Sequence, residues 1–405
     1  MYGLLGEKLA HSYSPAIHKL LGGYDYALFE KSSGEIGAFL KSGEFDGLNV
    51  TIPYKKAVIP YLDALDESAE KVGSVNTVVR TGKKLTGYNT DYDGFLYLVR
   101  QSGIEFFNKK VLILGTGGAS LAVNAVCKDL NAGEIIFISR SGENNYENLE
   151  KHSDADIIIN TTPVGMYPKN GVSPVKLTTF TKLSAVYDII YNPQKTKLIF
   201  EAEKLDIPAF SGLPMLVLQA KKACELFTGK AVSDEKAKQV INKISLSMKN
   251  IVLIGMAGCG KSSVGAALSR QLGRELIDTD SEIEKREKRT PAEIIKADGE
   301  AKFRQIETEV LKDCCKLSSK IIATGGGVVT VSENYESIKQ NSAVIFINRS
   351  VELWPTDNRP LSQINGKEEL FKKRLPLYRS FCDFEIDGNG TVDEVAHRIR
   401  EVLEL

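Results

Sequence analysis

The sequence predicts an α/β protein with at least two domains, and three observations support this. The chain has 405 residues, whereas single hydrophobic cores stop growing at about 250–300 residues. Short apolar runs alternate with helical patterns along most of the chain, which is typical of βαβ units around a parallel sheet. Hydrophobic residues make up 42% and charged residues 26% of the chain, a composition that excludes wholesale disorder.

The first part of the chain contains two stretches of alternating strands and helices. Within residues 1–100, strands are predicted at 2–5, 26–29, 48–52 and 75–79, with helices at 15–21 and 35–41. Within residues 101–215, strands are predicted at 111–114, 135–138, 157–159 and 185–187. Apolar residues then recur at intervals of three and four over 214–227 and 234–246, which predicts two helices.

A second alternation begins after Lys249, where we predict a domain boundary. Its strands are expected at residues 251–254, 275–277, 321–323 and 344–347. The short polar stretch 245–250 has neither a Pro-rich nor a Gly/Ser-rich composition. The two halves are therefore expected to be joined closely.

Charge and cysteine usage exclude several classes of protein. Basic and acidic residues number 52 each, whereas a nucleic-acid partner normally requires a clustered basic face. The six cysteines show no Cys-x-x-Cys spacing, which favours a reducing compartment over a disulfide framework. No apolar run approaches the ~18 residues of a membrane span, and Glu7 and Lys8 interrupt any secretory signal. We expect a cytoplasmic protein that binds neither nucleic acid nor membrane, and the oligomeric state stays open.

A phosphate-binding turn follows the strand predicted at 251–254. Residues 255–262 read Gly-Met-Ala-Gly-Cys-Gly-Lys-Ser and lead directly into a helical segment at 263–272. In such a turn, backbone N–H groups point at the phosphates, Lys261 reaches the β- and γ-phosphates, and Ser262 holds Mg²⁺. A glycine-rich turn without a ligand is disfavoured because strand, motif and helix occur in order. The predicted contacts to ATP and Mg²⁺ are Gly258, Cys259, Gly260, Lys261, Ser262 and Ser263.

Two carboxylates, Asp278 and Asp280, follow the next predicted strand. An open parallel sheet has its ligand crevice at this edge, where one carboxylate is suited to Mg²⁺ and the other to an acceptor hydroxyl. The alternative is that Asp280 caps a helix over 281–288. Taken alone, the dipeptide favours the cap.

Four further sequence motifs follow, and the order of all these motifs resembles that of a known family. They are Phe303-Arg-Gln-Ile-Glu307 in a predicted helix, Gly325-Gly-Gly327 after a strand, Asn358-Arg-Pro-Leu361 in a polar loop and Lys373-Arg-Leu-Pro-Leu-Tyr378. With the phosphate-binding turn and the Asp-Thr-Asp string, this order resembles shikimate kinase over essentially all of residues 250–405. The stretch from Ile347 to Arg359 is a few residues shorter than is usual in that family and lacks the arginine typically found beside the adenine.

The resemblance to shikimate kinase implies a role for each matching residue. Shikimate is expected to be surrounded by Asp280, Arg304, Gly326, Gly327 and Arg374. The two arginines would bind its carboxylate through paired N–H donors. The resemblance also makes Asp280 the base on the 3-hydroxyl, Asp278 a Mg²⁺ partner and Arg359 the lid arginine that closes on the transferring phosphoryl group.

A second nucleotide site is predicted near residue 115. Residues 111–120 read Val-Leu-Ile-Leu-Gly-Thr-Gly-Gly-Ala-Ser, a strand that leads through a glycine turn into a helix. Ser120 occupies the third glycine position of the dinucleotide motif, so a tight turn without a ligand stays open as an alternative. The next strand ends in Ser139-Arg140-Ser141, and an arginine there suits the 2′-phosphate of NADP, whereas a carboxylate would suit NAD.

Further strings make the first part of the chain resemble shikimate dehydrogenase over residues 1–246. They are His11-Ser-Tyr-Ser-Pro15, Asn49-Val-Thr-Ile-Pro-Tyr-Lys55, Gly73-Ser-Val-Asn-Thr77, Asn89-Thr-Asp91, Asn160-Thr-Thr-Pro-Val-Gly-Met166, Tyr187-Asp-Ile-Ile-Tyr191, and Gly212-Leu-Pro-Met215 with Gln219. In that family the last helices return to the first domain. Residues 1–100 and 216–246 are therefore expected to form the substrate domain, and residues 101–215 a Rossmann-like NADP domain.

This second resemblance also implies residue roles. Lys55 and Asp91 would form the proton-transfer pair. Without the surrounding motifs, these two residues would be interpreted as a surface ion pair. The substrate carboxylate would be bound by Ser12 and Ser14, and the ring by Thr51, Asn76, Asn89, Tyr191 and Gln219. The expected NADP contacts are Gly115, Gly117, Gly118, Ala119, Ser139, Arg140, Ser141, Asn160, Thr161 and Met215.

Together the two resemblances predict a bifunctional enzyme of the shikimate pathway. NADPH would reduce 3-dehydroshikimate to shikimate, and ATP with Mg²⁺ would phosphorylate the 3-hydroxyl. Two alternatives stay open: quinate use by the first half, and a catalytically inactive sensor of pathway metabolites. The sensor predicts loss of chemical groups, yet Lys55, Asp91, Lys261, Asp280 and Arg304 are all present.

Overall fold

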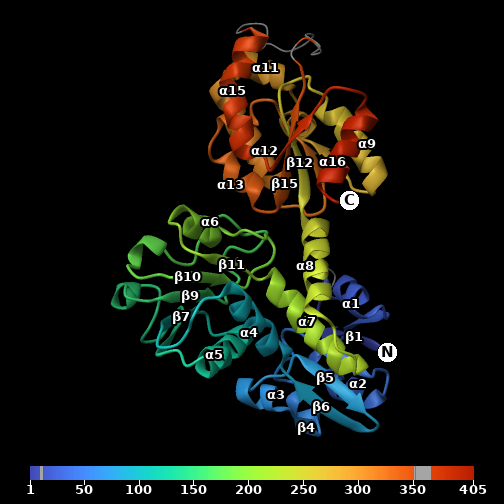
Figure 1. Ribbon diagram of the computed structural model, residues 1–405, viewed down its shortest axis with the longest axis vertical. Coiled ribbons are helices and arrows are strands. Elements are labelled where there is room, and N and C mark those ends of the chain that lie inside the picture. The colour runs from blue at the N-terminus through green and yellow to red at the C-terminus, as the bar shows by residue number, and fades with distance from the viewer. Residues whose placement is uncertain (10–11, 351, 353–365) are drawn as a thin grey trace. The chain divides into compact units, whose positions relative to one another are not determined.

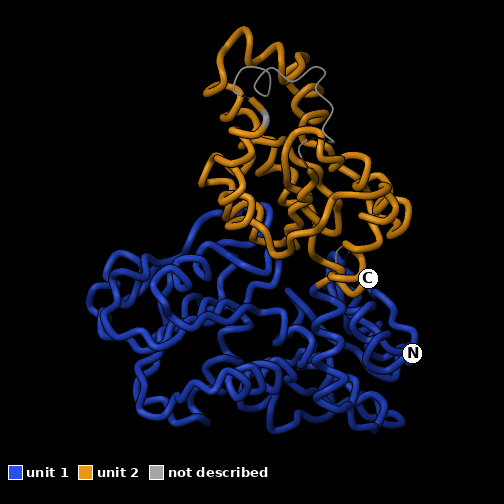
Figure 2. The backbone as a smooth tube through the Cα atoms, turned by 45° about the horizontal axis from the view of Figure 1, so that its top comes forward, with its two compact units in different colours: residues 1–245 blue, residues 246–405 orange. Residues whose placement is uncertain are grey.

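The chain forms two compact units, residues 1–245 and residues 246–405 (Figure 2). The structure is a computed structural model and describes residues 1–9, 12–350, 352 and 366–405. Arg359, the expected lid arginine, lies outside the described residues. The division between the units is close to Lys249, where the sequence predicts a change of domain.

The first unit begins with a six-stranded sheet in the order β2-β1-β3-β5-β6-β4. Its strands are β1 (Tyr2–Gly6), β2 (Tyr26–Glu30), β3 (Gly47–Val50), β4 (Ala64–Leu65), β5 (Thr77–Thr81) and β6 (Lys84–Tyr88). The helices of this region are α1 (Ser14–Gly22), α2 (Ile36–Ser42), α3 (Glu67–Val72) and α4 (Thr90–Ser102). The first strands are parallel, but β5 pairs antiparallel with both β3 and β6.

The parallel pairing that the alternation of strands and helices predicts is therefore confirmed for β1, β2 and β3, but not for β5, which runs antiparallel to its neighbours. Only two residues separate β5 from β6, and Gly82 among them has a φ of +62°. A tight turn of this kind reverses the chain directly, whereas a parallel pair would need a long crossover.

The middle of the first unit is a five-stranded parallel sheet in the order β11-β10-β9-β7-β8 (Figure 1). Its strands are β7 (Lys110–Leu114), β8 (Glu134–Ile138), β9 (Ile157–Asn160), β10 (Ala185–Asp188) and β11 (Ala209–Ser211). It carries the helices α5 (Gly118–Asp129) and α6 (Lys197–Lys204), and α7 (Leu213–Thr228) and α8 (Asp234–Met248) follow. The residues of β7 and β9 are almost fully buried, as expected for a sheet that is covered on both faces.

The second unit is built on a parallel sheet in the order β13-β14-β12-β15-β16. Its strands are β12 (Asn250–Ile254), β13 (Leu276–Asp278), β14 (Ile321–Ala323), β15 (Ser342–Asn348) and β16 (Phe384–Asp387). Its described helices are α9 (Lys261–Leu272), α10 (Thr279–Glu287), α11 (Pro291–Asp298), α12 (Glu300–Cys315), α13 (Asn334–Lys339), α15 (Lys367–Phe381) and α16 (Val392–Val402). One apolar cluster lies on each face of this sheet, so the strand ends are left as the polar edge that can bind ligands.

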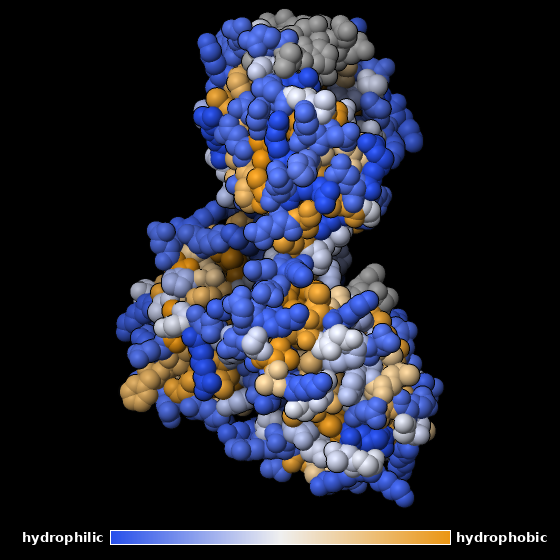
Figure 3. Space-filling model, turned by 45° about the vertical axis from the view of Figure 1, so that its right-hand side comes forward, coloured by the Kyte–Doolittle hydropathy of each residue, from blue (hydrophilic) through white to orange (hydrophobic). Residues whose placement is uncertain are grey.

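Hydrophilic side chains cover most of the surface in view in Figure 3, with apolar residues in small groups between them. Among the described residues, no helix combines the length and the apolar character needed to cross a membrane.

Candidate active sites

Lys55 and Asp91 form an ion pair within the first unit. Lys55 lies in the turn after β3, and Asp91 lies in the first turn of α4. The Lys55 Nζ is 2.5 Å from the Asp91 Oδ2, and the two side chains are 18% and 13% exposed. The pair is thus shielded from solvent and still accessible to a small molecule, as a proton-transfer site requires.

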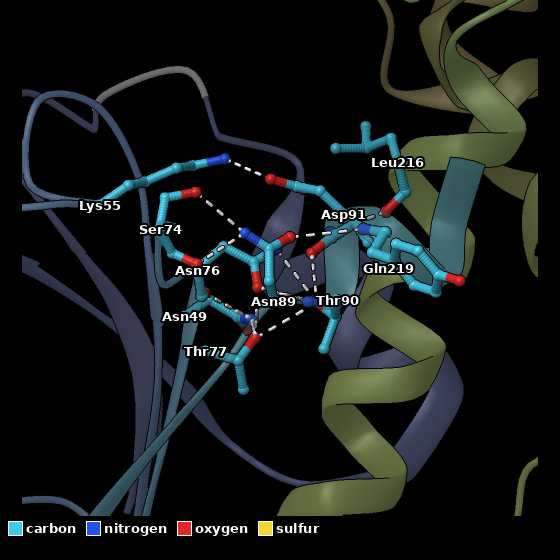
Figure 4. A network of polar contacts seen from close by, with 11 residues as sticks. Asn49, Lys55, Ser74, Asn76, Thr77, Asn89, Thr90, Asp91, Leu216 and Gln219 are labelled. Carbon is cyan, nitrogen blue, oxygen red and sulfur yellow. Dashed lines mark hydrogen bonds and ion pairs between the residues drawn. The ribbon is translucent and has the colours of Figure 1, made fainter. Parts of the chain in front are cut away.

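Amide side chains beside this pair are held in fixed orientations (Figure 4). The Asn76 Oδ1 accepts a hydrogen bond from the Thr90 backbone N at 2.7 Å, and the Asn76 Nδ2 donates to the Thr90 Oγ1 at 3.1 Å. Asn89 donates through Nδ2 to the Ser74 carbonyl and caps α4 through Oδ1. On α7, the Gln219 Nε2 donates to the Leu216 carbonyl.

Asn49 and Thr77 form a chain of hydrogen bonds that ends at Asn76. The Asn49 Nδ2 donates to the Thr77 Oγ1 at 3.0 Å, and the Thr77 Oγ1 in turn donates to the Asn76 Oδ1 at 3.1 Å. The Tyr26 hydroxyl donates to the Asn49 Oδ1 at 2.7 Å. Asn49, Asn76 and Thr77 are all buried, so these bonds fix the Asn76 amide in one orientation.

The serines expected to bind a carboxylate lie at the start of α1. Ser12 precedes the helix, and its Oγ accepts a hydrogen bond from the Ser14 backbone N at 3.2 Å. Tyr13, between them, packs edge-on against Tyr191 with ring centroids 6.3 Å apart. The structure therefore brings Tyr191 to the serine segment. Thr51 directly follows β3, and its backbone N donates to the Leu5 carbonyl.

The glycine turn after β7 adopts the conformation of a dinucleotide site. Gly115 has a φ of +98°, and its backbone N donates to the Ile138 carbonyl at 2.8 Å. A Cβ at Gly117 would meet nothing within 4 Å, and a Cβ at Gly118 would lie 3.7 Å from the Lys55 Cδ. The open turn therefore faces Lys55 at the start of α5, where Ala119 follows in the first helical turn.

Ser120 replaces glycine in this turn without blocking it. Its side chain is buried, and its Oγ donates to the Gly117 carbonyl at 2.6 Å. Because the Ser120 hydroxyl bonds to the backbone of the turn itself, a serine in place of the third glycine leaves the turn intact.

Asn160 and Thr161 follow β9 and make internal hydrogen bonds. The Asn160 Nδ2 donates to the Asp188 Oδ1 at 3.0 Å, and the Thr161 Oγ1 donates to the Leu114 carbonyl at 2.6 Å. Burial raises the pKa of Asp188 to about 6. These side chains hold the loop beside the glycine turn, and Met215 is buried at the start of α7.

Arg140 is exposed where the chain leaves β8. Ser139, just before it, is hydrogen-bonded through its Oγ to the Ser141 carbonyl, which gives the segment a defined turn. A guanidinium in this place is available to an anionic group.

The phosphate-binding turn of the second unit has the expected shape. Gly258 and Gly260 have φ values of +93° and +103°, and α9 begins at Lys261. The Lys261 Nζ donates to the carbonyls of Gly255 and Met256 at 3.0 and 2.9 Å. The Lys261 side chain therefore lies over the phosphate-binding turn, and its ammonium group is close to the place where a phosphate would bind.

The Ser262 Oγ donates to the Asp278 Oδ2 at 2.6 Å. The other oxygen of Asp278 accepts hydrogen bonds from the backbone N of Asp280 and of Ser281. Asp278, and not Asp280, is thus the N-cap of α10. The open alternative for Asp280 was wrong because the helix begins two residues earlier than the apolar pattern indicates, at Thr279.

Asp280 lies in an acidic, shielded setting beside the Gly325-Gly-Gly327 turn. A Cβ at Gly325 would lie 3.1 Å from the Asp280 Oδ1 and would collide with the Glu307 Oε1. Burial raises the pKa of Asp280 to about 6, and the neighbouring Asp278 and Glu307 add to the rise.

The two arginines of the predicted shikimate site meet at the same turn. The Arg304 Nη1 lies 2.6 Å from the Glu307 Oε2, and a Cβ at Gly327 would collide with the guanidinium. The Arg374 Nη1 donates to the Gly326 carbonyl at 3.1 Å. Glycine leaves room for the Arg304 guanidinium at Gly327 and for the backbone of Ala257 at Gly326, where a Cβ would lie 2.7 Å from the Ala257 N.

Sequence reasoning missed several residues that position these sites. Thr90, Glu307 and Tyr378 all fall inside quoted strings but received no role. Thr90 holds Asn76, Glu307 holds Arg304, and the Tyr378 hydroxyl donates to the Gly326 carbonyl at 2.5 Å. Glu307 is buried. The signal that could have identified it in the sequence is an acidic residue three positions after an arginine in a predicted helix.

Comparison with known proteins agrees with the division of the chain into two units. Residues 4–78 match the family model of the shikimate dehydrogenase substrate binding domain, and residues 257–404 match that of shikimate kinase. A shikimate dehydrogenase (NADP(+)) from Methanosphaera stadtmanae is 36% identical over 271 residues, which cover 60% of this chain and 95% of the relative. A second one, from Clostridium beijerinckii, is 38% identical over 245 residues, 56% of this chain and 91% of the relative.

Solved structures show the same relationship. A chorismate mutase/shikimate 5-dehydrogenase fusion protein from Clostridium acetobutylicum has a TM-score of 0.58 and 36% identity, covering 60% of this chain and 96% of the other. Shikimate 5-dehydrogenase from Thermus thermophilus, solved with NADP(H) and shikimate, has a TM-score of 0.55 and 29% identity, covering 60% and 98%. The chain therefore belongs to the shikimate dehydrogenase family in its first unit and continues into a shikimate kinase domain in its second.

Proposed function

We propose that the first unit reduces 3-dehydroshikimate to shikimate with NADPH, and that the second transfers a phosphoryl group from ATP to the 3-hydroxyl of that shikimate. The observation that carries the first activity is the Lys55–Asp91 pair, which lies beside the open glycine turn. The second rests on the convergence of Asp280 and Arg304 on the glycine run after β14.

In the dehydrogenase site, Lys55 is the group that serves the reacting oxygen. Bound NADPH supplies a hydride to the carbonyl carbon. The carbonyl oxygen then gains negative charge, which the Lys55 ammonium stabilises and neutralises by donating a proton. The Asp91 Oδ2 accepts a hydrogen bond from the Lys55 Nζ at 2.5 Å and orients the lysine. The rest of the substrate would be held by Ser12, Ser14, Thr51, Asn76, Asn89, Tyr191 and Gln219.

In the kinase site, the chain's own groups position and deprotonate the acceptor. Arg304 and Arg374 bind the carboxylate of shikimate beside Gly326 and Gly327, and this places the 3-hydroxyl next to Asp280. Asp280 accepts the hydroxyl proton as the oxygen attacks, and Lys261 neutralises charge on the phosphates.

The polar groups present also fit the expected nucleotides and Mg²⁺. A hydroxyl and a carboxylate oxygen meet 2.6 Å apart at Ser262 and Asp278, and both are oxygen donors of the type that Mg²⁺ prefers. When bound, this ion supplies charge neutralisation at the phosphates. The bare glycine turn at the start of α5 and the exposed Arg140 fit the pyrophosphate and the 2′-phosphate of NADP.

Arg140→Ala should raise the KM for NADPH roughly 10- to 100-fold, since a hydrogen bond to a charged group contributes about 1.5–3 kcal/mol. The KM for NADH should change little, because NADH lacks the 2′-phosphate. Steady-state kinetics with both cofactors measures this. An equal loss with both would show that Arg140 has a general structural role.

The kinase rate should depend on pH through Asp280. Because burial and acidic neighbours raise its pKa to about 6, this base is protonated below that value and ionised above it. We expect kcat/KM for shikimate to fall tenfold for each pH unit well below 6 and to level off above it. A profile that is flat between pH 5 and 7 would remove Asp280 from the role of base.

A two-step assay tests the proposed function as a whole. NADPH oxidation is followed with 3-dehydroshikimate, and ADP release is then followed after ATP and Mg²⁺ are added. Quinate with NADP⁺ serves as the comparison substrate. Failure of both reactions with correctly folded protein would favour the inactive sensor.

A further inference from the structure

Arg349 lies against the phosphate-binding turn, at the end of β15. A Cβ at Gly260 would be 3.8 Å from the Arg349 Nη1, and a Cβ at Gly255 would be 2.8 Å from the Ile347 carbonyl oxygen. The beginning of the turn thus packs on the end of β15, and the last glycine before Lys261 is next to the guanidinium. This is a cation at the turn in addition to Lys261.

The sheet order places Arg349 on the side away from the acceptor. In the order β13-β14-β12-β15-β16, the turn follows β12. Asp280 and Arg304 gather at the ends of β13 and β14, on one side of the turn. Arg349 follows β15, on the other side. Because the phosphoryl group passes across the turn towards Asp280, the rest of the donor must extend towards β15.

The backbone around Arg349 is held by the loop after β16. The Gly388 backbone N donates to the Asn348 carbonyl at 2.7 Å, and the Ser350 backbone N donates to the Asn389 Oδ1 at 3.2 Å. Arg398 in turn fixes this loop, because its Nη1 donates to the carbonyls of Asp387 and Asn389 at 2.8 and 2.7 Å.

A small residue in this loop leaves room for the arginine. A Cβ at Gly388 would come 3.0 Å from the Arg349 Cβ, so a larger side chain would displace it. Hydrogen bonds thus hold the backbone on both sides of Arg349, which lowers the entropy cost of a contact made by this residue.

We propose that Arg349 binds the nucleoside end of the donor nucleotide, beyond the reach of Lys261 and Ser262. The planar guanidinium is suited to both chemical features found there, since it donates to phosphate oxygens and stacks on a purine. The inference rests on the proposed kinase activity of the second unit.

The test compares Arg349→Met with Arg270→Met, which removes an exposed arginine from the last turn of α9. In R349M the KM for ATP should rise about tenfold, while the KM for shikimate stays within twofold. In R270M both constants should match those of the wild type. An unchanged thermal unfolding transition of the second unit, residues 246–405, reports that each variant is folded. ADP binding, measured by calorimetry without shikimate, should weaken by the same factor as the KM for ATP rises.

Two results would overturn the inference: an unchanged KM for ATP in R349M, or an equal rise in the KM for shikimate. Should R349M fail to fold, Arg349→Lys replaces it, and its affinity for ADP must fall below that of the wild type. An inactive wild-type kinase would refute the proposed function instead, while ADP binding by the variants would still decide the role of Arg349.

Discussion

Lys55→Met lowers the rate of 3-dehydroshikimate reduction by about 10²–10⁴, the usual contribution of a positioned proton donor. The expected loss is in kcat, because the ammonium acts mainly when negative charge develops on the carbonyl oxygen. Methionine keeps the length of the side chain but cannot donate. NADPH binding should be close to that of the wild type, as measured by fluorescence titration.

The neighbouring Lys56 provides the matched control. It is exposed beside the half-buried Lys55, so Lys56→Met removes the same charge from the same turn without touching Asp91. It should keep the normal rate. Near-normal turnover in Lys55→Met would remove this residue from the chemistry, and an equal loss in both variants would point to the charge of the turn alone.

Asp280→Asn lowers the kinase rate by a comparable factor, about 10²–10⁴. The amide has nearly the same shape as the carboxylate but cannot take the proton of the 3-hydroxyl. Loss of one negative charge beside Asp278 and Glu307 relieves repulsion, so the folded state should not be weakened. ADP release with saturating shikimate measures the effect.

Glu284→Gln is the control for this substitution, since Glu284 is an exposed acidic residue of the same helix, α10. Its kinase rate should equal that of the wild type, and both variants should reduce 3-dehydroshikimate normally. A kinase rate in Asp280→Asn within twofold of the wild type would exclude Asp280 as the base.

The sequence predicts most of the features that depend on residues close together in the chain, such as the glycine turns between a strand and a helix. The turns at Gly115 and Gly260 were predicted because a strand, a glycine run and a helix follow one another within a few residues. The structure gives both glycines positive φ values. The strands β4, β6, β11 and β16 were missed. Three of them have only two to four residues, which carry too little periodicity to distinguish a strand from a loop. The fourth, β6, is the second strand of the hairpin that it forms with β5.

The support of the site depends on tertiary contacts that no local pattern encodes. Asn49 and Asn76 are 27 residues apart, and they are joined only where β3 pairs with β5. The antiparallel direction of β5 was itself not predicted. In the same way, Asp278 reads as a metal ligand in sequence, and the structure adds that its second oxygen caps α10.

The central claim is that one chain carries out two consecutive reactions on one small molecule. The most direct measurement follows the products formed from 3-dehydroshikimate when the full chain is given NADPH, ATP and Mg²⁺ together, with the two variants beside the wild type. The wild type should form shikimate 3-phosphate. Asp280→Asn should stop at shikimate, and Lys55→Met should form almost no product from 3-dehydroshikimate yet phosphorylate added shikimate at the normal rate. Absence of phosphorylated product from the wild type, or loss of both activities in either variant, would contradict the account.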